Sequence, residues 1–253
     1  IGDGHRLARA LNIPVCFDFR SADVAAGGEG APLAPLFHLA MVDALQRPVT
    51  VLNLGGVANI TWIGDGAISE PERVNMLAFD TGPGNGLLDD WMLKRTGLAM
   101  DRDGATSARG RVDWELIRSI MQDSFFAECP PKSLDRFTFS LKPVMHLSIE
   151  DGAATLAAFT ANCVRHALSQ CPEKPREILV TGGGRHNATI MRLLAQTTGI
   201  TVRPIEDVGC SGDHLEAQAF AFLAARAANN LPLTYPKTTG VPSPQTGGTV
   251  VYP

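Results

Sequence analysis

The sequence predicts an α/β protein, because short apolar segments of strand length alternate with segments of helical spacing. Two apolar segments run into glycine turns, at 49–60 (VTVLNLGGVANI) and at 77–85 (LAFDTGPGN). A third, at 177–181, is followed by three consecutive glycines and then by a segment with helical spacing. In open α/β sheets, a glycine turn at the carboxyl end of a parallel strand is a common nucleotide site. The first two turns together therefore favour a phosphoryl-transfer site, and the third favours a nucleotide site.

The elements on either side of the first two glycine turns are read from local composition. Residues 13–19 are expected as a strand, 21–30 as a glycine-rich loop and 35–45 as a helix that Pro48 separates from the next strand. Residues 85–95 carry apolar side chains on one side and are expected as a helix that stops at Gly97.

The second half alternates in the same way. The polar segment 101–110 is expected as a lid or hinge, and the segment from 130 to 143 as a loop. Apolar spacing predicts helices at 112–126, 153–169, 187–198 and 213–228, and strands at 177–181 and 200–205. The second of these strands would complete a βαβ unit. The tail from Pro232 is rich in proline and is expected to be irregular.

Composition excludes several classes of protein. Apolar residues make up 45%, charged residues 19%, and the net charge is −4. With no basic run, nucleic acid is not an expected partner, and no apolar stretch reaches the length of a membrane helix. The five cysteines form no CxxC pair and are expected as free thiols in a cytoplasmic protein. The six histidines lack paired-ligand spacing, so no protein-bound metal site is expected.

Asp80 is the strongest catalytic candidate. The apolar run 76–79 would bury its strand, so that Asp80 leaves the core where the strand meets a cleft. Burial would raise the pKa of this carboxyl, whereas nearby backbone N–H donors would lower it. A carboxylate in that position suits general-base chemistry beside a phosphate. The alternative is a turn or cap residue.

The glycine and asparagine candidates also have two interpretations each. Gly55-Gly56 either forms a hairpin turn or lets phosphate approach the backbone. Asn53 and Asn59 flank that turn and either satisfy backbone groups or contact a ligand. Asn85 follows the turn at Gly84 as an expected helix N-cap, and its helix start could also face an anion.

The carboxy-terminal half adds two motifs. Gly182-Gly183-Gly184 with Asn187 lies between a strand and a helix, which favours contact with adenosine. Glu216 follows Asp213 by three residues and is either part of a capping box or a contact to substrate.

The segments NLGGVAN, AFDTGPGNGLLDDW and ILVTGGGRHN resemble the anhydro-N-acetylmuramic acid kinases. The same resemblance extends to GDGHRLARALNIPVCFDFRSADVAAGGEGAPLAPLFH near the start and to GDHLEAQAFAFLAAR near the end. One departure is that the glycine, threonine and serine-rich loop (GTSxDG-like) that opens the family is absent. The chain is therefore expected to be the carboxy-terminal majority of a longer kinase.

The resemblance implies the actin-like ATPase fold of sugar kinases, with two lobes around a nucleotide cleft and an incomplete first lobe. Residues 1–47 would be the remainder of the first lobe. Residues 48–229 would form the second lobe with the sugar and nucleotide motifs. The tail, 230–253, would return to the first lobe.

The resemblance also implies roles for the candidates. Asp80 aligns with the family's general base. The expected sugar contacts are Asn59, Gly84, Asn85 and Glu216, and the expected nucleotide contacts are Gly55, Gly56, Gly182, Gly183, Gly184 and Asn187. Arg109, Lys132, Arg136 and Lys142 are possible partners of a carboxylate or phosphate, with solvated surface as the default for each.

The function that follows is ATP-dependent opening of the 1,6-anhydro ring of anhydro-N-acetylmuramic acid with phosphorylation of O6, in peptidoglycan recycling. ATP and Mg²⁺ are the expected cofactors, with Mg²⁺ held mainly by nucleotide oxygens and water. A homodimer is expected from the family. The alternatives are a kinase of the same fold for another sugar and a catalytically silent nucleotide- or ligand-binding fragment.

Overall fold

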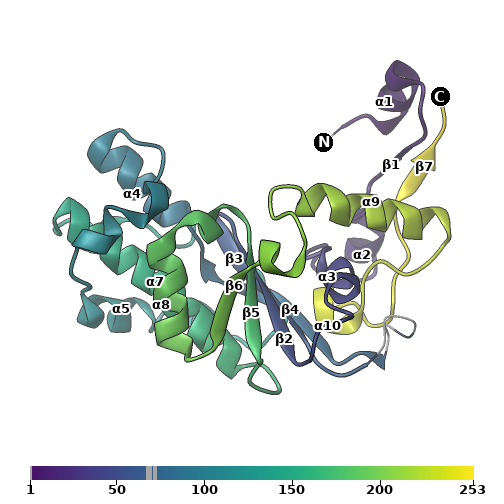
Figure 1. The fold of residues 1–253 in the computed structure, drawn as a ribbon. Helices are drawn as coiled ribbons and strands as arrows, with labels where there is room; N and C mark the ends of the chain where they lie inside the picture. Colours follow the sequence, from purple (N-terminus) through teal and green to yellow (C-terminus); the bar gives the residue numbers. More distant parts are fainter. Residues whose placement is uncertain (1, 67–69, 71–72) are drawn as a thin grey trace.

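A mixed five-stranded sheet forms the centre of the molecule in the computed structural model, which describes residues 2–66, 70 and 73–253 (Figure 1). The strand order is β4-β3-β2-β5-β6. The antiparallel part consists of β2 (Val49–Leu54), β3 (Val57–Ile63) and β4 (Met76–Pro83). The strands β5 (Glu177–Thr181) and β6 (Thr201–Pro204) continue the sheet parallel to β2. The predicted α/β class and the βαβ unit are confirmed.

Helices cover both faces of the sheet (Figure 1). Successive side chains of a strand point to opposite faces, and β2 shows this directly: Leu52 and Leu54 join one core cluster, whereas Val49 and Val51 join the other. The first cluster includes α4 (Gly86–Thr96), α7 (Ile149–Ser169) and α8 (Ala188–Thr198), and the second includes α3 (Pro35–Met41) and α9 (Leu215–Ala228). The central strands are therefore apolar on both faces, as expected of a sheet between helical layers.

The two ends of the chain meet in a separate ribbon. The strand β1 (Val15–Phe17) pairs antiparallel with β7 (Thr249–Val251), beside α1 (Gly4–Leu11) (Figure 1). This pairing brings the residues before 48 and those after 229 together. The division of the chain into a first-lobe remainder, a second lobe and a returning tail remains a prediction.

Short elements complete the described structure. The short α-helices are α2 (Ser21–Ala25), α5 (Trp114–Ile120), α6 (Ser124–Ala127) and α10 (Pro236–Thr239). The 3₁₀ turns are η2 (Arg102–Gly104), η3 (Ser107–Arg109), η4 (Lys142–Val144), η5 (Gly183–His186) and η6 (Ile205–Val208).

Some boundaries differ from the sequence prediction. The loop expected at 21–30 begins with the helix α2, and the single helix expected at 112–126 is divided into α5 and α6. The division occurs because Asp123 leaves the helix and accepts a hydrogen bond from the Phe125 N–H, which starts a new helix. The stop at Gly97 is confirmed, with a left-handed φ of 76°.

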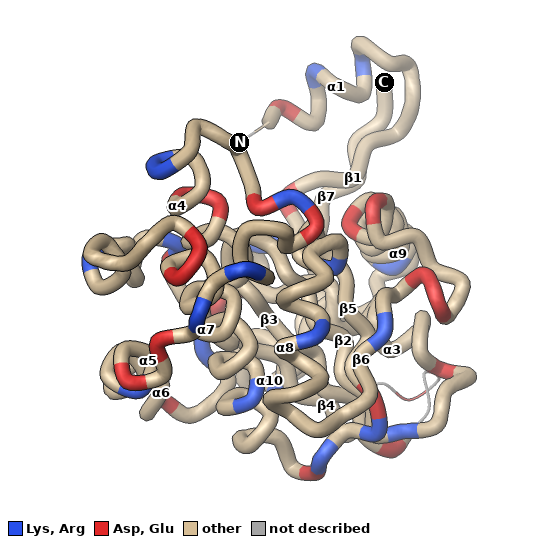
Figure 2. Tube along the Cα trace, turned by 60° about the vertical axis from the view of Figure 1, so that its left-hand side comes forward, with Lys and Arg blue, Asp and Glu red and all other residues tan. Residues whose placement is uncertain are grey.

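Charged residues of both signs are interspersed over the chain (Figure 2). All five cysteines are free, and Cys163 is fully buried in the core, as predicted. Within the part of the chain that the structure describes, every helix is too short or too polar to cross a membrane.

Candidate active site

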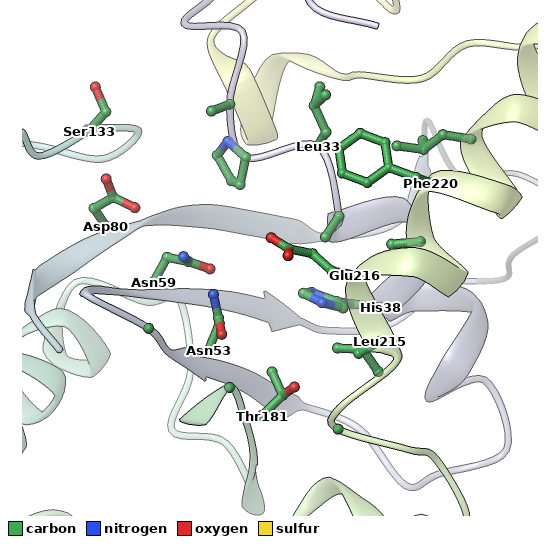
Figure 3. Close-up of a pocket in the computed structure, with 18 of the residues that line it drawn as sticks. Leu33, His38, Asn53, Asn59, Asp80, Ser133, Thr181, Leu215, Glu216 and Phe220 are labelled. Carbon is green, nitrogen blue, oxygen red and sulfur yellow. The ribbon is translucent and has the colours of Figure 1, made fainter. Parts of the chain in front are cut away.

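A cavity of about 430 Å³ lies over one end of the sheet. Asn53, Asn59 and Asp80 reach it from three neighbouring strands, and Glu216 reaches it from α9 on the opposite side (Figure 3). Leu33 and Phe220 form an apolar wall farther along the cavity (Figure 3). One cavity thus combines carboxylates, amides and an apolar surface.

Strand register explains why these polar residues meet. Thr181 of β5 pairs with Asn53 of β2, Asn53 with Asn59 of β3, and Asn59 with Asp80 of β4. Residues opposite each other on adjacent strands project to the same face. The register therefore forms a row of four polar residues across four strands, and all four line the cavity.

A bulge in β4 sets the position of Asp80. Asn59 pairs with Asp80 but the preceding Ala58 pairs with Gly82, so Thr81 is an extra residue on β4. A bulge bends its strand and re-aims the neighbouring side chains. Asp80 therefore lies inside β4 and not at its end, because the strand continues past the bulge to Pro83.

The segment 132–134 holds Asp80 from the other side. The Asp80 N–H donates to the Lys132 carbonyl at 3.0 Å, and the Leu134 N–H donates to Asp80 Oδ2 at 2.8 Å. Burial raises the pKa of Asp80 to about 6, against the opposing effect of the Leu134 N–H. A general base works best when its pKa lies near the working pH.

Lys132 is buried, contrary to the prediction of a solvated surface residue. Its Nζ donates to the Phe125 carbonyl at 2.8 Å and to the Glu128 carbonyl at 3.1 Å. The ammonium group also lies 4.4 Å from the centre of the Phe125 ring. These contacts fix the segment whose backbone orients Asp80. Arg109, Arg136 and Lys142 are exposed, as predicted.

Gly55 and Gly56 lie in the turn between β2 and β3, where Leu54 pairs with Ala58, so the hairpin interpretation is confirmed. The Gly55 carbonyl accepts the Asn85 N–H at 2.8 Å. The Gly56 carbonyl accepts the N–H groups of Gly84 and Gly86, at 3.0 and 3.2 Å. The N–H groups of Gly84, Asn85 and Gly86 are therefore bonded within the protein, and the expectation that the start of α4 could face an anion stays a prediction.

Close packing explains several of the glycines. A Cβ atom on Gly84 would overlap the Gly55 carbonyl, and one on Gly184 would overlap Asn85 Oδ1. By contrast, a Cβ atom on Gly183 would meet its nearest neighbour, Asn85 Nδ2, at 3.6 Å. Position 183 consequently has room for a side chain, so packing alone does not explain why a glycine stands there.

The predicted site residues divide into two groups. The cavity lining includes Asn53, Gly55, Asn59, Asp80, Gly182 and Glu216. The other predicted residues lie outside the lining, and they are Gly56, Gly84, Asn85, Gly183, Gly184 and Asn187.

The two asparagines outside the lining have different environments. Asn187 caps α8 by accepting the Ile190 N–H at 3.0 Å, and its amide donates to the Asp101 carbonyl at 3.4 Å. Asn85 occupies the N-cap position of α4 but makes no side-chain cap bond. Its Oδ1 is buried and has no hydrogen-bond partner among the described residues.

The start of α9 corrects another expectation. The helix begins at Leu215 after His214, without a side-chain cap, so the predicted capping box of Asp213 and Glu216 is wrong. Asp213 instead pairs with Arg185. Glu216 is exposed in the cavity and accepts no hydrogen bond from the described residues (Figure 3).

Among the cavity residues that sequence reasoning missed are Arg20 and His38. Arg20 is the only Lys or Arg that lines the cavity among the described residues, and its Nη1 donates to the Gly30 carbonyl at 2.8 Å. His38 lies 2.8 Å from the hydroxyl of Thr61, and burial lowers its pKa to about 4, so it is neutral. A single histidine on a helix gives no sequence signal for a site. Arg20, by contrast, lies inside the segment near the start of the chain that carries the family resemblance.

No group of three or more His, Cys, Asp or Glu side chains within residues 2–66, 70 and 73–253 is arranged to hold a metal ion.

Comparison with known proteins places the chain in a family. The family model described as anhydro-N-acetylmuramic acid kinase matches residues 1–253. A relative of that name from Rhodospirillum rubrum is 55% identical over 249 residues, covering 98% of this chain and 65% of the relative. Another from Zymomonas mobilis is 52% identical over 252 residues, covering 100% of this chain and 67% of the relative. The chain thus spans about two thirds of the length of these relatives.

Solved structures are more distantly similar. Xylulose kinase from Rhodospirillum rubrum matches with a TM-score of 0.48 and 15% identity, over 85% of this chain and 44% of that one. The activator of the 2-hydroxyisocaproyl-CoA dehydratase from Clostridium difficile, solved with bound ADPNP, matches with a TM-score of 0.46 and 18% identity, over 76% and 66%. Neither likeness says anything about a ligand here. With the whole chain matched by one family model and by relatives more than 50% identical, the chain belongs to the anhydro-N-acetylmuramic acid kinase family.

Proposed function

We propose that the chain carries the sugar site and part of the nucleotide site of an ATP-dependent kinase for anhydro-N-acetylmuramic acid. The product would be N-acetylmuramic acid 6-phosphate, in peptidoglycan recycling. The observation that carries the proposal is the carboxylate of Asp80, half-buried in the cavity, fixed by the Leu134 N–H and with a pKa of about 6. Family membership supplies the substrate.

Asp80 accepts a proton from a water molecule in this mechanism. The water oxygen bonds to the anomeric carbon as the bond from that carbon to O6 breaks. O6 then bonds to the γ-phosphorus of ATP, whose bond to the bridging oxygen breaks to release ADP. Catalysis of phosphoryl transfer is mainly positioning and charge stabilisation. Asn53 and Asn59 lie in the same cross-strand row as Asp80 and would orient the sugar.

The nucleotide would approach the glycine turns. Gly55 and Gly182 line the cavity, and Gly183 leaves open space where a side chain would otherwise stand. Mg²⁺ would be held mainly by nucleotide oxygens and water, and it would there neutralise negative charge on the phosphates.

The remaining lining supports an acidic amino sugar. Arg20 is the one Lys or Arg of the described lining, and the lactyl carboxylate is the one anionic group of the sugar. Leu33 and Phe220 offer an apolar surface for the acetyl or lactyl methyl group. We extend the proposal to a homodimer in the cytoplasm on the family resemblance alone.

The test is turnover of anhydro-N-acetylmuramic acid with ATP by the complete protein. Mass spectrometry of the product should show one added water and one added phosphoryl group, and depend on the sugar. ATP hydrolysis without sugar phosphorylation, or a preference for a sugar without the anhydro ring, would contradict the proposal.

A further inference from the structure

Arg185 joins two loops that border the cavity. It lies in η5, directly after Gly182-Gly183-Gly184, and its side chain is 4% exposed. The opposite loop runs from η6 to the start of α9 and carries the carboxylates of Glu206 and Asp213. The two loops are thus connected by one buried guanidinium group.

Each part of the guanidinium group has a separate partner. Nε donates to Glu206 Oε1 at 2.9 Å, Nη1 to the Gly182 carbonyl at 2.9 Å, and Nη2 to Asp213 Oδ1 at 2.5 Å. Glu206 Oε1 also accepts the Gly212 N–H, at 3.1 Å. The planar, five-donor geometry of arginine suits several fixed acceptors at once, and lysine could not reproduce it.

The packing around Arg185 is close. A Cβ atom on Gly212 would lie 2.5 Å from Arg185 Nε, so a side chain there would displace the guanidinium group. The hydrogen bond from Arg185 also holds the pKa of Asp213 below its ordinary value. Glu206 and Asp213 have side chains that are 44% and 70% exposed, so the buried end of the connection is the arginine.

Both connected loops supply cavity lining. Gly182 lies on one side, and Gly212, Asp213 and Glu216 lie on the other. Removal of the guanidinium group would free the η6–α9 loop from the triple-glycine turn. The nucleotide side and the Glu216 side of the cavity would then no longer be held at a fixed separation.

We propose that Arg185 is a positioning residue that holds the triple-glycine turn and the start of α9 together as one wall, so that ATP and sugar bind in a fixed relative position. The proposal rests on the proposed function for its two ligands. The geometry that supports it is independent of the reaction.

Arg185→Met tests the connection, and Arg203→Met is the matched control. Arg203 of β6 makes a two-donor ion pair with Glu177 of β5, at 2.6 and 2.9 Å. Neither Arg203 nor Glu177 lines the cavity. In the complete protein, Arg185→Met should raise KM for both ATP and the anhydro sugar roughly tenfold, with a smaller change in kcat. Arg203→Met should lower Tm and leave both KM values unchanged.

Backbone hydrogen exchange gives a readout that does not require activity. In Arg185→Met, exchange at residues 206–214 should become faster, with protection of β2 and β5 retained, whereas Arg203→Met should not affect these residues. Unchanged exchange at 206–214 in Arg185→Met, or equal KM changes in the two variants, would overturn the proposal. A wild-type protein that fails to phosphorylate the sugar would overturn the proposed function, and exchange would still decide the role of Arg185.

Discussion

At the scale of single residues, Asp80 shows two opposing effects on one carboxyl group. Burial disfavours the charged form, whereas the Leu134 N–H favours it. Sequence predicts both effects but not their balance, because the depth of burial depends on how the segment 132–134 covers the strand. In the structure burial prevails, and the pKa of Asp80 is about 6.

The first prediction concerns the pH dependence of turnover. A general base acts only when deprotonated, so kcat should rise with pH through about 6 and level off above about 7. Steady-state rates between pH 5 and 8 measure this profile. A flat profile through pH 6 would show that Asp80 is not the base. Asp89 gives a useful comparison, because burial also raises its pKa to about 6 although it lies outside the cavity lining.

The second prediction is that Asp80→Asn lowers kcat by about 10² to 10⁴, the usual contribution of general-base catalysis. Its stability should behave differently. Because the folded pKa of about 6 lies above the ordinary value of 3.8, the native state binds more protons, and the free energy of unfolding falls as pH rises between these values. Asparagine has no charged form that burial disfavours, and its side-chain oxygen can still accept the Leu134 N–H.

Asp80→Asn should therefore show a Tm at pH 7 that is equal to or above that of the wild type. Asp89→Asn, the control, should keep its kcat. A near-normal kcat for Asp80→Asn, or a fall in kcat matched by unfolding, would support the interpretation of Asp80 as a turn residue.

At the scale of elements, local patterns predicted the central strands well. The segments 49–60 and 177–181 are apolar on both faces, and a strand between two helical layers requires this composition. The bulge at Thr81 was not predictable, because it is defined by pairing with β3 and not by any residue of β4 itself. For the same reason, Asn59 and Asp80 could be predicted as candidates from the sequence, but their pairing across β3 and β4 could not.

The prediction of a capping box at the start of α9 was wrong for a related reason. Asp213 and Glu216 have the spacing of a capping box, but a buried arginine 28 residues away provides Asp213 with a charged partner. A tertiary ion pair thus replaces the local cap. His38 escaped notice because its importance comes only from the cavity that forms around it.

The third prediction separates a packing role from a ligand role within the triple glycine. Gly183→Val should leave Tm near the wild-type value, since the nearest neighbour of its Cβ lies at 3.6 Å, and should weaken ATP binding more than sugar binding. Gly184→Ala should instead destabilise the fold by about 1 to 3 kcal/mol, because its Cβ would overlap Asn85 Oδ1 and lie 2.6 Å from Leu54 Cβ.

Calorimetry with an ATP analogue and thermal unfolding measure the two effects. If Gly183→Val binds the analogue normally but loses the sugar, the assignment of Gly183 to the nucleotide is wrong. If Gly184→Ala is as stable as the wild type, the close packing of this turn does not require a glycine at position 184.

At the scale of the whole molecule, one buried carboxylate connects the two ends of the chain. Asp23 of α2 is 2% exposed. Its Oδ1 accepts the Gly30 N–H at 2.7 Å. Its Oδ2 accepts the hydroxyl of Thr239 at 2.6 Å and that of Thr234. The contacts bring the segment before residue 31 and the tail beyond 230 together, next to the β1–β7 ribbon.

This connection also reaches the cavity. Gly30 receives a second contact from Arg20, whose Nη1 donates to its carbonyl, and the lining residues 31–34 follow directly. The apolar wall at Leu33 thus depends on the position of Gly30. A loss of Asp23 should therefore affect both the stability of the tail and the sugar end of the cavity.

The last prediction is that Asp23→Ala lowers the free energy of unfolding by about 3 kcal/mol, because it leaves one N–H and two hydroxyl groups buried without an acceptor. Asp3→Ala is the control: among the described residues, the Asp3 carboxylate accepts one hydrogen bond, from the exposed Arg6 N–H at the start of α1, and its loss should cost about 1 kcal/mol or less. Urea unfolding measures both costs. Limited proteolysis should cleave the tail beyond residue 230 faster in Asp23→Ala, and KM for the sugar should rise while KM for ATP stays constant. If the two variants are equally stable and equally resistant to protease, the ends of the chain are held by the β1–β7 pairing, and Asp23 is dispensable.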